Sequence, residues 1–144
     1  MKAKDFFTAE QKQKIEAAIK EAELNTSGEI RVHIENHCKD DVLDCAAFWF
    51  EKLAMHKTEL RNGVLFYLAI QDKKFAILGD AGINAKVADD FWNEIKEQMK
   101  TEFQKNRFAE GLTNGILTAG DQLKKYFPHQ IDDINELNDE ISFS

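Results

Sequence analysis

The sequence predicts an α/β domain, a three-layer α/β/α sandwich around a small mixed sheet, and three observations predict it. Segments with helical spacing alternate with short segments that have the character of strands. A strand, a helix and a second strand follow one another over residues 29–70, an order that predicts a right-handed parallel pair. A short polar turn at 71–74 then predicts an antiparallel hairpin.

Length and composition fit one folded domain. The 144 residues are 43% hydrophobic and include 11 phenylalanines, enough apolar material for a core without cross-links. One proline and seven glycines leave no linker-like tract. We assign residues 1–128 to the domain and 129–144 to an acidic C-terminal tail that could form a short helix or fray.

The first helix is expected over residues 9–24, where isoleucines and alanines recur at helical spacing. Thr8 and Gln11 form a capping-box pattern at its start. Residues 29–35 alternate apolar and polar side chains, which predicts a strand that is buried on one side or lies near an edge of the sheet.

Helical spacing returns over residues 41–58. The apolar stripe of this helix consists of Val42, Cys45, Ala46, Trp49 and Leu53. Residues 64–70 are apolar throughout, which predicts a central strand that helices cover on both faces. Residues 75–78 supply the second strand of the hairpin.

Two further helices are expected, over residues 85–104 and about 108–126. Gly111 and Gly115, four residues apart, remove side chains from one face of the second helix and would let a neighbouring backbone come close. Pro128 ends this helix.

Cys38 and Cys45 are expected to be reduced thiols, because two cysteines make no disulfide framework. A zinc site that adds His33 and His37 is disfavoured, since the spacing fits no zinc motif and Cys45 falls on the apolar stripe of a helix. We expect a buried cysteine and surface histidines instead.

The charge balance argues against several classes of partner. With 26 acidic and 19 basic residues the formal net charge is −7, which repels nucleic-acid phosphates and anionic lipid and suits cations. The longest apolar stretch is too short to span a membrane, and the first residues lack the apolar run of a signal peptide. We expect a cytoplasmic protein, or a trimmed domain whose anchor lies outside this chain.

The topology brings three glycine-containing turns to one end of the sheet, carrying Glu29, Asn62 and Asp80. The next helix would begin near Asn84 and place Asp90 in its early turns. Oxygen ligands on loops, main-chain carbonyls among them, suit a hard cation such as calcium. The alternative is purely structural, with glycines marking tight turns and Asp80 capping one of them.

The same turns carry a resemblance to a known family. Several blocks, in their order and spacing, resemble those of the TPM domain family, and the likeness extends from Phe6 to Pro128. They are Ser27-Gly28-Glu29-Ile30, Asn62-Gly63-Val64-Leu65, the short charged turn at 71–74 and Gly79-Asp80-Ala81-Gly82-Ile83. A bacterial subgroup of the family is resembled by Phe91-Trp92, Phe108, Glu110-Gly111-Leu112 and Tyr126-Phe127-Pro128. The family includes a thylakoid-lumen acid phosphatase linked to photosystem II repair and many bacterial envelope proteins.

The resemblance implies an α/β/α sandwich that binds a divalent metal, notably calcium, at these loops, with Mg²⁺ as another candidate. Carried over to this sequence, the ligand candidates are Glu29, Asp80, Asn62 and Asp90. Many relatives carry a signal sequence and a membrane-spanning tail, and this sequence shows neither.

Three functions follow as hypotheses. The leading one is a divalent-cation-binding domain, with calcium as the cation. The second is a metal-dependent phosphatase acting on phosphate monoesters, because some members of the family are reported as phosphatases. The third is a protein-interaction module without metal, whose protein partner is unidentified.

Overall fold

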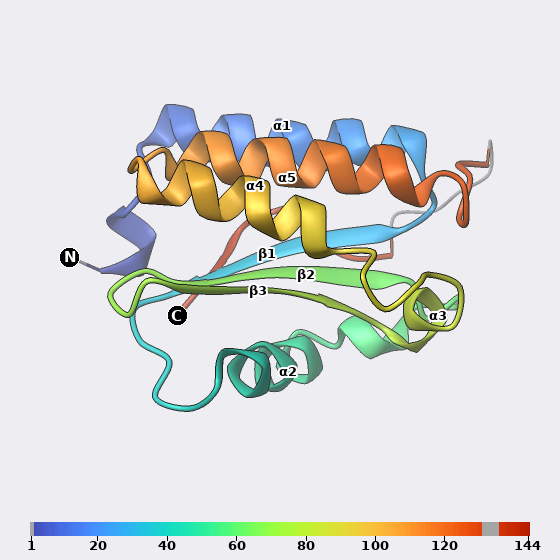
Figure 1. Cartoon of the computed structure of the whole chain (residues 1–144), viewed down its shortest axis with the longest axis horizontal. Coiled ribbons are helices and arrows are strands. Elements are labelled where there is room, and N and C mark those ends of the chain that lie inside the picture. Colours follow the sequence, from blue (N-terminus) through green and yellow to red (C-terminus); the bar gives the residue numbers. More distant parts are fainter. Residues whose placement is uncertain (1, 131–135) are drawn as a thin grey trace.

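The computed structural model of the chain describes residues 2–130 and 136–144. Helices α1, α4 and α5 pack on one face of a sheet and α2 packs on the other, so the predicted α/β/α sandwich is confirmed (Figure 1). The helices are α1 (Ala9–Asn25), α2 (Val42–Lys52), α3 (Ala81–Asn84), α4 (Asn93–Gln104) and α5 (Phe108–Leu123). The strands are β1 (Glu29–Glu35), β2 (Gly63–Ala69), β3 (Lys74–Gly79) and β4 (Ser142–Phe143).

The sheet has the order β3-β2-β1-β4. Strand β1 is parallel to β2, with Glu29 opposite Gly63, and β2 is antiparallel to β3, with Val64 opposite Gly79. Both the parallel βαβ unit and the hairpin are therefore as predicted. Every residue of β2 is buried, as its continuous apolar run requires.

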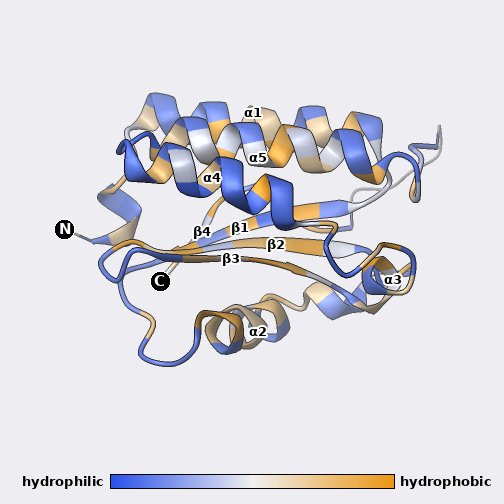
Figure 2. Cartoon of the chain, viewed as in Figure 1, coloured by the Kyte–Doolittle hydropathy of each residue, from blue (hydrophilic) through white to orange (hydrophobic). Residues whose placement is uncertain are grey.

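Two cores lie on the two faces of the sheet. Hydrophobic residues dominate β2 and recur among hydrophilic ones along the helices that cover it (Figure 2). The larger core joins α1, α4 and α5 to β1 and β2. The smaller one lies under α2 and contains the whole stripe predicted for that helix, with Ala46 buried and the other members packed around it. Thr8 and Gln11 form the predicted capping box at the start of α1.

Two predicted helices are shorter than expected. The helix expected over 41–58 ends at Lys52, because Ala54 adopts a left-handed conformation (φ 57°) that an α-helix cannot continue. The helix expected over 85–104 begins only at Asn93, as α4, because residues 85–92 form turns, and the separate one-turn helix α3 precedes them. Between α3 and α4, Phe91 and Trp92 pack edge-to-face on each other, with Trp92 buried in the larger core and Phe91 packed against it.

The described part of the tail differs from our expectation. Residues 142–143 form β4, which is parallel to β1 and makes the edge of the sheet, and Ile141 is buried in the larger core. Apolar Ile141 and the partly buried Leu137 anchor a segment that its acidic composition alone would leave in solvent. Residues 131–135 of the tail lie outside the described residues.

The expectation of surface histidines is wrong for His33, which is fully buried. Its ring stacks on Trp49 of α2 with centroids 4.0 Å apart. Its two ring nitrogens lie 2.9 Å from Ser142 Oγ and 3.0 Å from Ser144 Oγ. The polar face of β1 is thus covered by α2 and by the C-terminal segment, which the sequence pattern did not reveal.

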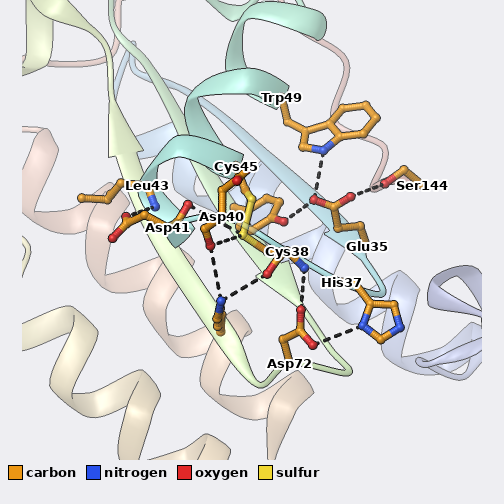
Figure 3. Close-up of a disulfide and its surroundings, with 12 residues drawn as sticks. Glu35, His37, Cys38, Asp40, Asp41, Leu43, Cys45, Trp49, Asp72 and Ser144 are labelled. Carbon is orange, nitrogen blue, oxygen red and sulfur yellow. Dashed lines mark hydrogen bonds and ion pairs between the residues drawn. A yellow bond between two sulfur atoms is a disulfide. The ribbon is translucent and has the colours of Figure 1, made fainter.

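The expectation of reduced thiols is also wrong, since Cys38 and Cys45 form a disulfide (Figure 3). The loop after β1 turns back toward the first turns of α2, so the two Cα atoms lie 6.2 Å apart, within the range a disulfide spans. Asp72 holds this loop, because its carboxylate accepts the Cys38 N–H at 2.7 Å and contacts His37 Nδ1 at 3.1 Å (Figure 3).

Candidate functional site

The three turns predicted to converge do so at one end of the sheet, where β1 and β2 begin and β3 ends. The Glu29 N–H donates to the Asn62 carbonyl at 3.1 Å, and the Asp80 N–H donates to the Gly63 carbonyl at 2.9 Å. We call these turns, residues 27–29, 61–63 and 79–82, the rim. Figure 1 shows them at the end of the sheet where α3 lies.

Glu29 is a buried carboxylate with only 4% of its surface exposed. Its Oε1 accepts the Glu136 N–H at 2.7 Å, whereas its Oε2 has no hydrogen-bond partner among the described residues. Burial raises the pKa of Glu29 to about 7, and the backbone N–H groups of Glu136 and Leu137 act in the opposite direction. The carboxyl group therefore lacks a compensating cation within the described structure.

Further carboxylates lie around Glu29. Glu23 of α1 accepts the Ile30 N–H at 3.1 Å and so satisfies the open edge of β1. Burial, followed by a side-chain hydrogen bond with Asp139 and the charges of Asp139 and Glu29, raises the pKa of Glu23 to about 9, against the opposing effect of the Ile30 N–H. Because burial raises the pKa of both carboxyl groups, their ionised forms are costly here, and a bound cation would offset that cost.

Asn62 is 2% exposed and is the most deeply buried polar side chain of the rim. Its Nδ2 donates to the Ser27 carbonyl at 3.0 Å, and its N–H donates to Thr58 Oγ1 at 3.2 Å. Its Oδ1 has no partner among the residues described. The amide thus offers an unused neutral oxygen at the start of β2.

Asp80 makes the contacts expected if its role is structural, as the cap of a tight turn. Its carboxylate accepts two hydrogen bonds from the Arg61 guanidinium, at 2.7 and 2.8 Å, and it caps α3 by accepting the Ala81 N–H at 2.7 Å. Burial alone would raise the pKa of Asp80, but Arg61 and the Ala81 amide outweigh it and hold the pKa below its ordinary value. Half of the Arg61 side chain is exposed, so this guanidinium can move into solvent.

Glu29 and Asp80 lie on the same face of the sheet, the face that α2 covers. Side chains alternate along a strand, so Glu29 shares the face of His33, which stacks on α2. Asp80 borders a hollow together with Phe50 of α2. Strands β1 and β3, which flank β2, lie about 10 Å apart. Between Glu29 at the start of β1 and Asp80 at the end of β3, the residue on β2 is Gly63.

Gly63 and Gly82 are glycines because backbone passes close to them. A Cβ on Gly63 would lie 3.0 Å from the Met55 carbonyl oxygen. A Cβ on Gly82 would lie 2.2 Å from the Leu60 carbonyl oxygen and 2.6 Å from that of Arg61. The rim therefore combines acidic side chains with main-chain carbonyl oxygens, the ligand types that calcium takes.

Asp90 is not at the start of a helix as expected. It lies exposed in the turn between α3 and α4, where its carbonyl accepts the Asn93 N–H at 3.0 Å. In residues 2–130 and 136–144, no group of three or more His, Cys, Asp or Glu side chains is placed to hold a metal. Any cation at the rim would therefore need neutral oxygens among its ligands.

Sequence reasoning missed three residues of this region, Glu23, Arg61 and Glu136. Glu23 lies on a polar position of an amphipathic helix, and Glu136 lies in the tail, so neither carries a local signal. Arg61 directly precedes the Asn62-Gly63 turn and has a left-handed backbone (φ 51°). Its position in a turn next to the predicted rim was the one usable sign.

The fold and the rim define a class, an α/β/α domain with oxygen-rich loops at one end of a mixed sheet. A family model described as the TPM domain matches residues 1–122. The chain belongs to the TPM domain family, as its sequence resemblance indicated.

Solved structures agree with this assignment. The chain is 48% identical to the BA42 protein of the psychrophilic bacterium Bizionia argentinensis, with a TM-score of 0.92 over 97% of each chain. It shares the fold, at 16% identity, with the N-terminal domain of a protein from P. gingivalis (TM-score 0.73, 88% of this chain and 82% of that one). It also shares the fold, at 14% identity, with the N-terminal domain of the cg2496 protein of Corynebacterium glutamicum (TM-score 0.62, 81% and 74%).

A comparison with curated proteins gives no match. Among the helices that the structure describes, none is both long and apolar enough to cross a membrane.

Proposed function

We propose that this TPM domain binds a divalent cation, calcium, at the rim, with Glu29 as the anchoring ligand. The observation that carries the proposal is the buried Glu29 carboxylate, one oxygen of which has no partner among the described residues. Burying a carboxylate without a partner is costly, and a bound cation would offset this cost.

The neutral oxygens of the rim support calcium in particular. Calcium takes six to eight oxygen ligands in flexible geometry and accepts carbonyl oxygens and waters, whereas Mg²⁺ demands a tight octahedron. Asn62 Oδ1 is unused, and the Met55 carbonyl lies over Gly63 between the strands that carry Glu29 and Asp80. These groups would add neutral ligands to the charge of Glu29.

Asp80 would join the site by exchanging the Arg61 guanidinium for the calcium ion. The Arg61 guanidinium pairs with Asp80 at 2.7 Å and neutralises its charge. When calcium binds, Arg61 would swing into solvent and Asp80 would turn to the ion. Asp90 is exposed in the turn between α3 and α4, and among the described residues no hydrogen bond or ion pair joins it to the other candidate ligands, so we do not include it in the proposed site.

Thermal melts after chelator treatment, repeated with calcium and with magnesium, test this proposal. A ligand that binds only the folded state, at about a hundred times its dissociation constant, raises the free energy of unfolding by about 2.7 kcal/mol. In a domain of this size this corresponds to a rise in Tm of roughly 5 to 10 °C. We expect calcium to raise the Tm by this amount at pH 8 and by less at pH 6, because protons compete with calcium for Glu29, whose pKa is raised to about 7.

The Glu29→Gln variant distinguishes a loss of calcium binding from a general loss of stability. Because the folded pKa of Glu29 lies above its ordinary value of 4.5, the ionised form costs stability above about pH 5. At pH 8 without calcium, the free energy of unfolding of the variant should therefore exceed that of the wild type by roughly 1 to 3 kcal/mol. Added calcium should no longer raise the Tm of the variant. A Glu29→Gln protein that still responds fully to calcium would contradict the proposal.

Asp80→Asn and Arg61→Gln locate the second ligand. If Asp80 binds the ion, Asp80→Asn weakens calcium binding sharply, and Arg61→Gln strengthens it by removing the competing guanidinium. Unchanged calcium affinity in both variants would remove Asp80 from the site. The phosphatase and interaction-module hypotheses are not tested by these observations and stay predictions.

A further inference from the structure

A pocket of about 430 Å³ lies at the opposite end of the sheet from the rim. It is formed by the β2–β3 hairpin and the C-terminal part of α4, which come together at that end (Figure 1). Its volume falls within the range of 300 to 1,000 Å³ that is typical of small-molecule sites. Nothing in the proposed cation site uses it.

The interior of this pocket is aromatic. Phe75 of the hairpin meets Phe103 of α4 edge-to-face at 5.0 Å between ring centroids. Phe103 stacks on Phe108 at 5.3 Å. All three rings are only partly buried, and Ile70 borders them, so the pocket presents apolar surface that a ligand could cover.

The mouth of the pocket is cationic. Lys73, Lys74 and Lys100 all line it, and none of the described lining residues is acidic. Lys74 Nζ donates to the carbonyls of Cys38 (3.1 Å) and Asp40 (3.3 Å), which are neutral acceptors. Within the described structure Lys73 and Lys100 form no ion pair.

Nearby carboxylates are already engaged elsewhere. Asp72, next to Lys73, is held by the Cys38 N–H and by His37. Glu102, next to Phe103, pairs with Arg107 at 3.8 Å. Lys74 also lies near the charge of Asp72. In a chain whose net charge is −7, Lys73 and Lys100, which form no ion pair within the described structure, are a local reversal of charge.

Lys73 also occupies a backbone position that favours glycine. Its φ of 54° lies in the left-handed region, which costs a lysine about 1 kcal/mol relative to glycine. The turn therefore places a lysine, at some cost, at the mouth of the pocket. Opposite it, the carboxamides of Gln104 and Asn106 provide further hydrogen-bonding groups on the lining.

We propose that this pocket binds a soluble organic anion with an apolar body, an aromatic ring system or short acyl chain bearing one carboxylate or phosphate. The apolar body covers Phe75, Phe103 and Phe108, while Lys73 and Lys100 hold the anionic group by charge-assisted hydrogen bonds. The charge of the mouth selects anions over neutral compounds of the same shape.

The probe pair 2-naphthoate and 2-naphthalenemethanol tests this directly, because the two share a ring system and differ in charge. In amide-resolved NMR titrations of the whole chain, 2-naphthoate should give saturable shifts at residues 68–75 and 103–108. The neutral alcohol should bind about tenfold more weakly, the change expected when a charge-assisted contact is lost.

A matched pair of double variants isolates the lysines. Lys73→Gln with Lys100→Gln should weaken 2-naphthoate binding about tenfold. Lys20→Gln with Lys52→Gln, which makes the same change of net charge at exposed helix positions, should leave it unchanged.

The proposal would be overturned if the alcohol and the acid bound with equal affinity. It would also be overturned if the two double variants lost the same affinity for 2-naphthoate. Vesicles of phosphatidylglycerol provide the second arm, since the proposal predicts no line broadening with them. Broadening by vesicles without saturable shifts from 2-naphthoate would assign the lysines to a membrane surface and overturn the proposal.

Discussion

At the scale of single residues, His33 explains how the C-terminal segment is attached. The ring lies between Trp49 of α2 and the hydroxyl groups of Ser142 and Ser144. Glu35, two residues along β1, accepts hydrogen bonds from Trp49 Nε1 at 3.1 Å, from Ser144 Oγ at 3.2 Å and from the Tyr67 hydroxyl (Figure 3). Buried polar groups that are satisfied in this way fix one arrangement of the segment.

His33 gives the protein a stability that depends on pH. Burial lowers the pKa of His33 from 6.5 to about 4. A folded pKa below the unfolded one means that the unfolded state binds more protons, so this stability is present above pH 6.5 and is lost as the pH falls toward 4. Urea unfolding at pH 6.5, 5.5 and 4.5 should show this loss, up to about 3 kcal/mol.

His33→Phe should flatten this part of the pH dependence, because the aromatic ring keeps its stacking on Trp49 and no longer titrates. His129→Gln is the control, since His129 is exposed and the substitution removes a histidine from the surface. A His33→Phe protein with the full wild-type slope between pH 6.5 and 4.5 would contradict the account.

At the scale of elements, α1 and α5 pack with their backbones unusually close. A Cβ on Gly120 would lie 2.6 Å from the Ala22 Cβ and 2.8 Å from its Cα. The glycines predicted to permit a close approach, Gly111 and Gly115, face Phe103 and Met99 of α4, so that these two side chains fill the space. The close approach of backbones occurs one turn further along, at Gly120.

Gly120→Ala should therefore destabilise the protein by about 1 to 3 kcal/mol, because the added methyl group must push two helices apart. In an isolated helix the same change would stabilise by about 1 kcal/mol. Asn114→Ala, at an exposed position of the same helix, should be neutral or slightly stabilising. Urea unfolding of the two variants tests this, and a Gly120→Ala protein as stable as the wild type would refute it.

The elements themselves were largely predictable from the sequence. Periodicity located the first helix, the all-buried strand and the hairpin, because each has one dominant physical pattern. The break between α3 and α4 was missed, since Val87, Phe91, Ile95, Met99 and Phe103 continue one apolar spacing across it. The pairing of Cys38 with Cys45 was missed because it depends on how the preceding loop folds back.

At the scale of the molecule, the two ends of the sheet have opposite character. The rim contains the carboxylates of Glu29 and Asp80, with Glu23 beside Glu29, whereas at the hairpin end Lys73 and Lys100 line a pocket together with aromatic rings. The sheet holds these two regions at a fixed separation. The proposed cation site and the proposed anion site therefore lie at opposite ends of one sheet.

The candidate rim was predictable only in outline. Parallel pairing and a hairpin were sufficient to bring Glu29, Asn62 and Asp80 to one end. Which carboxylate stays uncompensated depends on side-chain partners, and the ion pair between Arg61 and Asp80 is invisible in the spacing of residues. The approach of Glu136 to Glu29 links residues 107 positions apart, which no local pattern encodes.

The most direct test of the central claim is a calcium titration of the chelator-treated protein at pH 8, followed by the amide NMR signals. We predict saturable shifts at Gly28, Glu29, Asn62 and Gly63, with no comparable shifts at the hairpin end and none in Glu29→Gln. Absence of shifts at these amides up to millimolar calcium, or the same shifts in Glu29→Gln, would contradict the assignment of the rim as a calcium site.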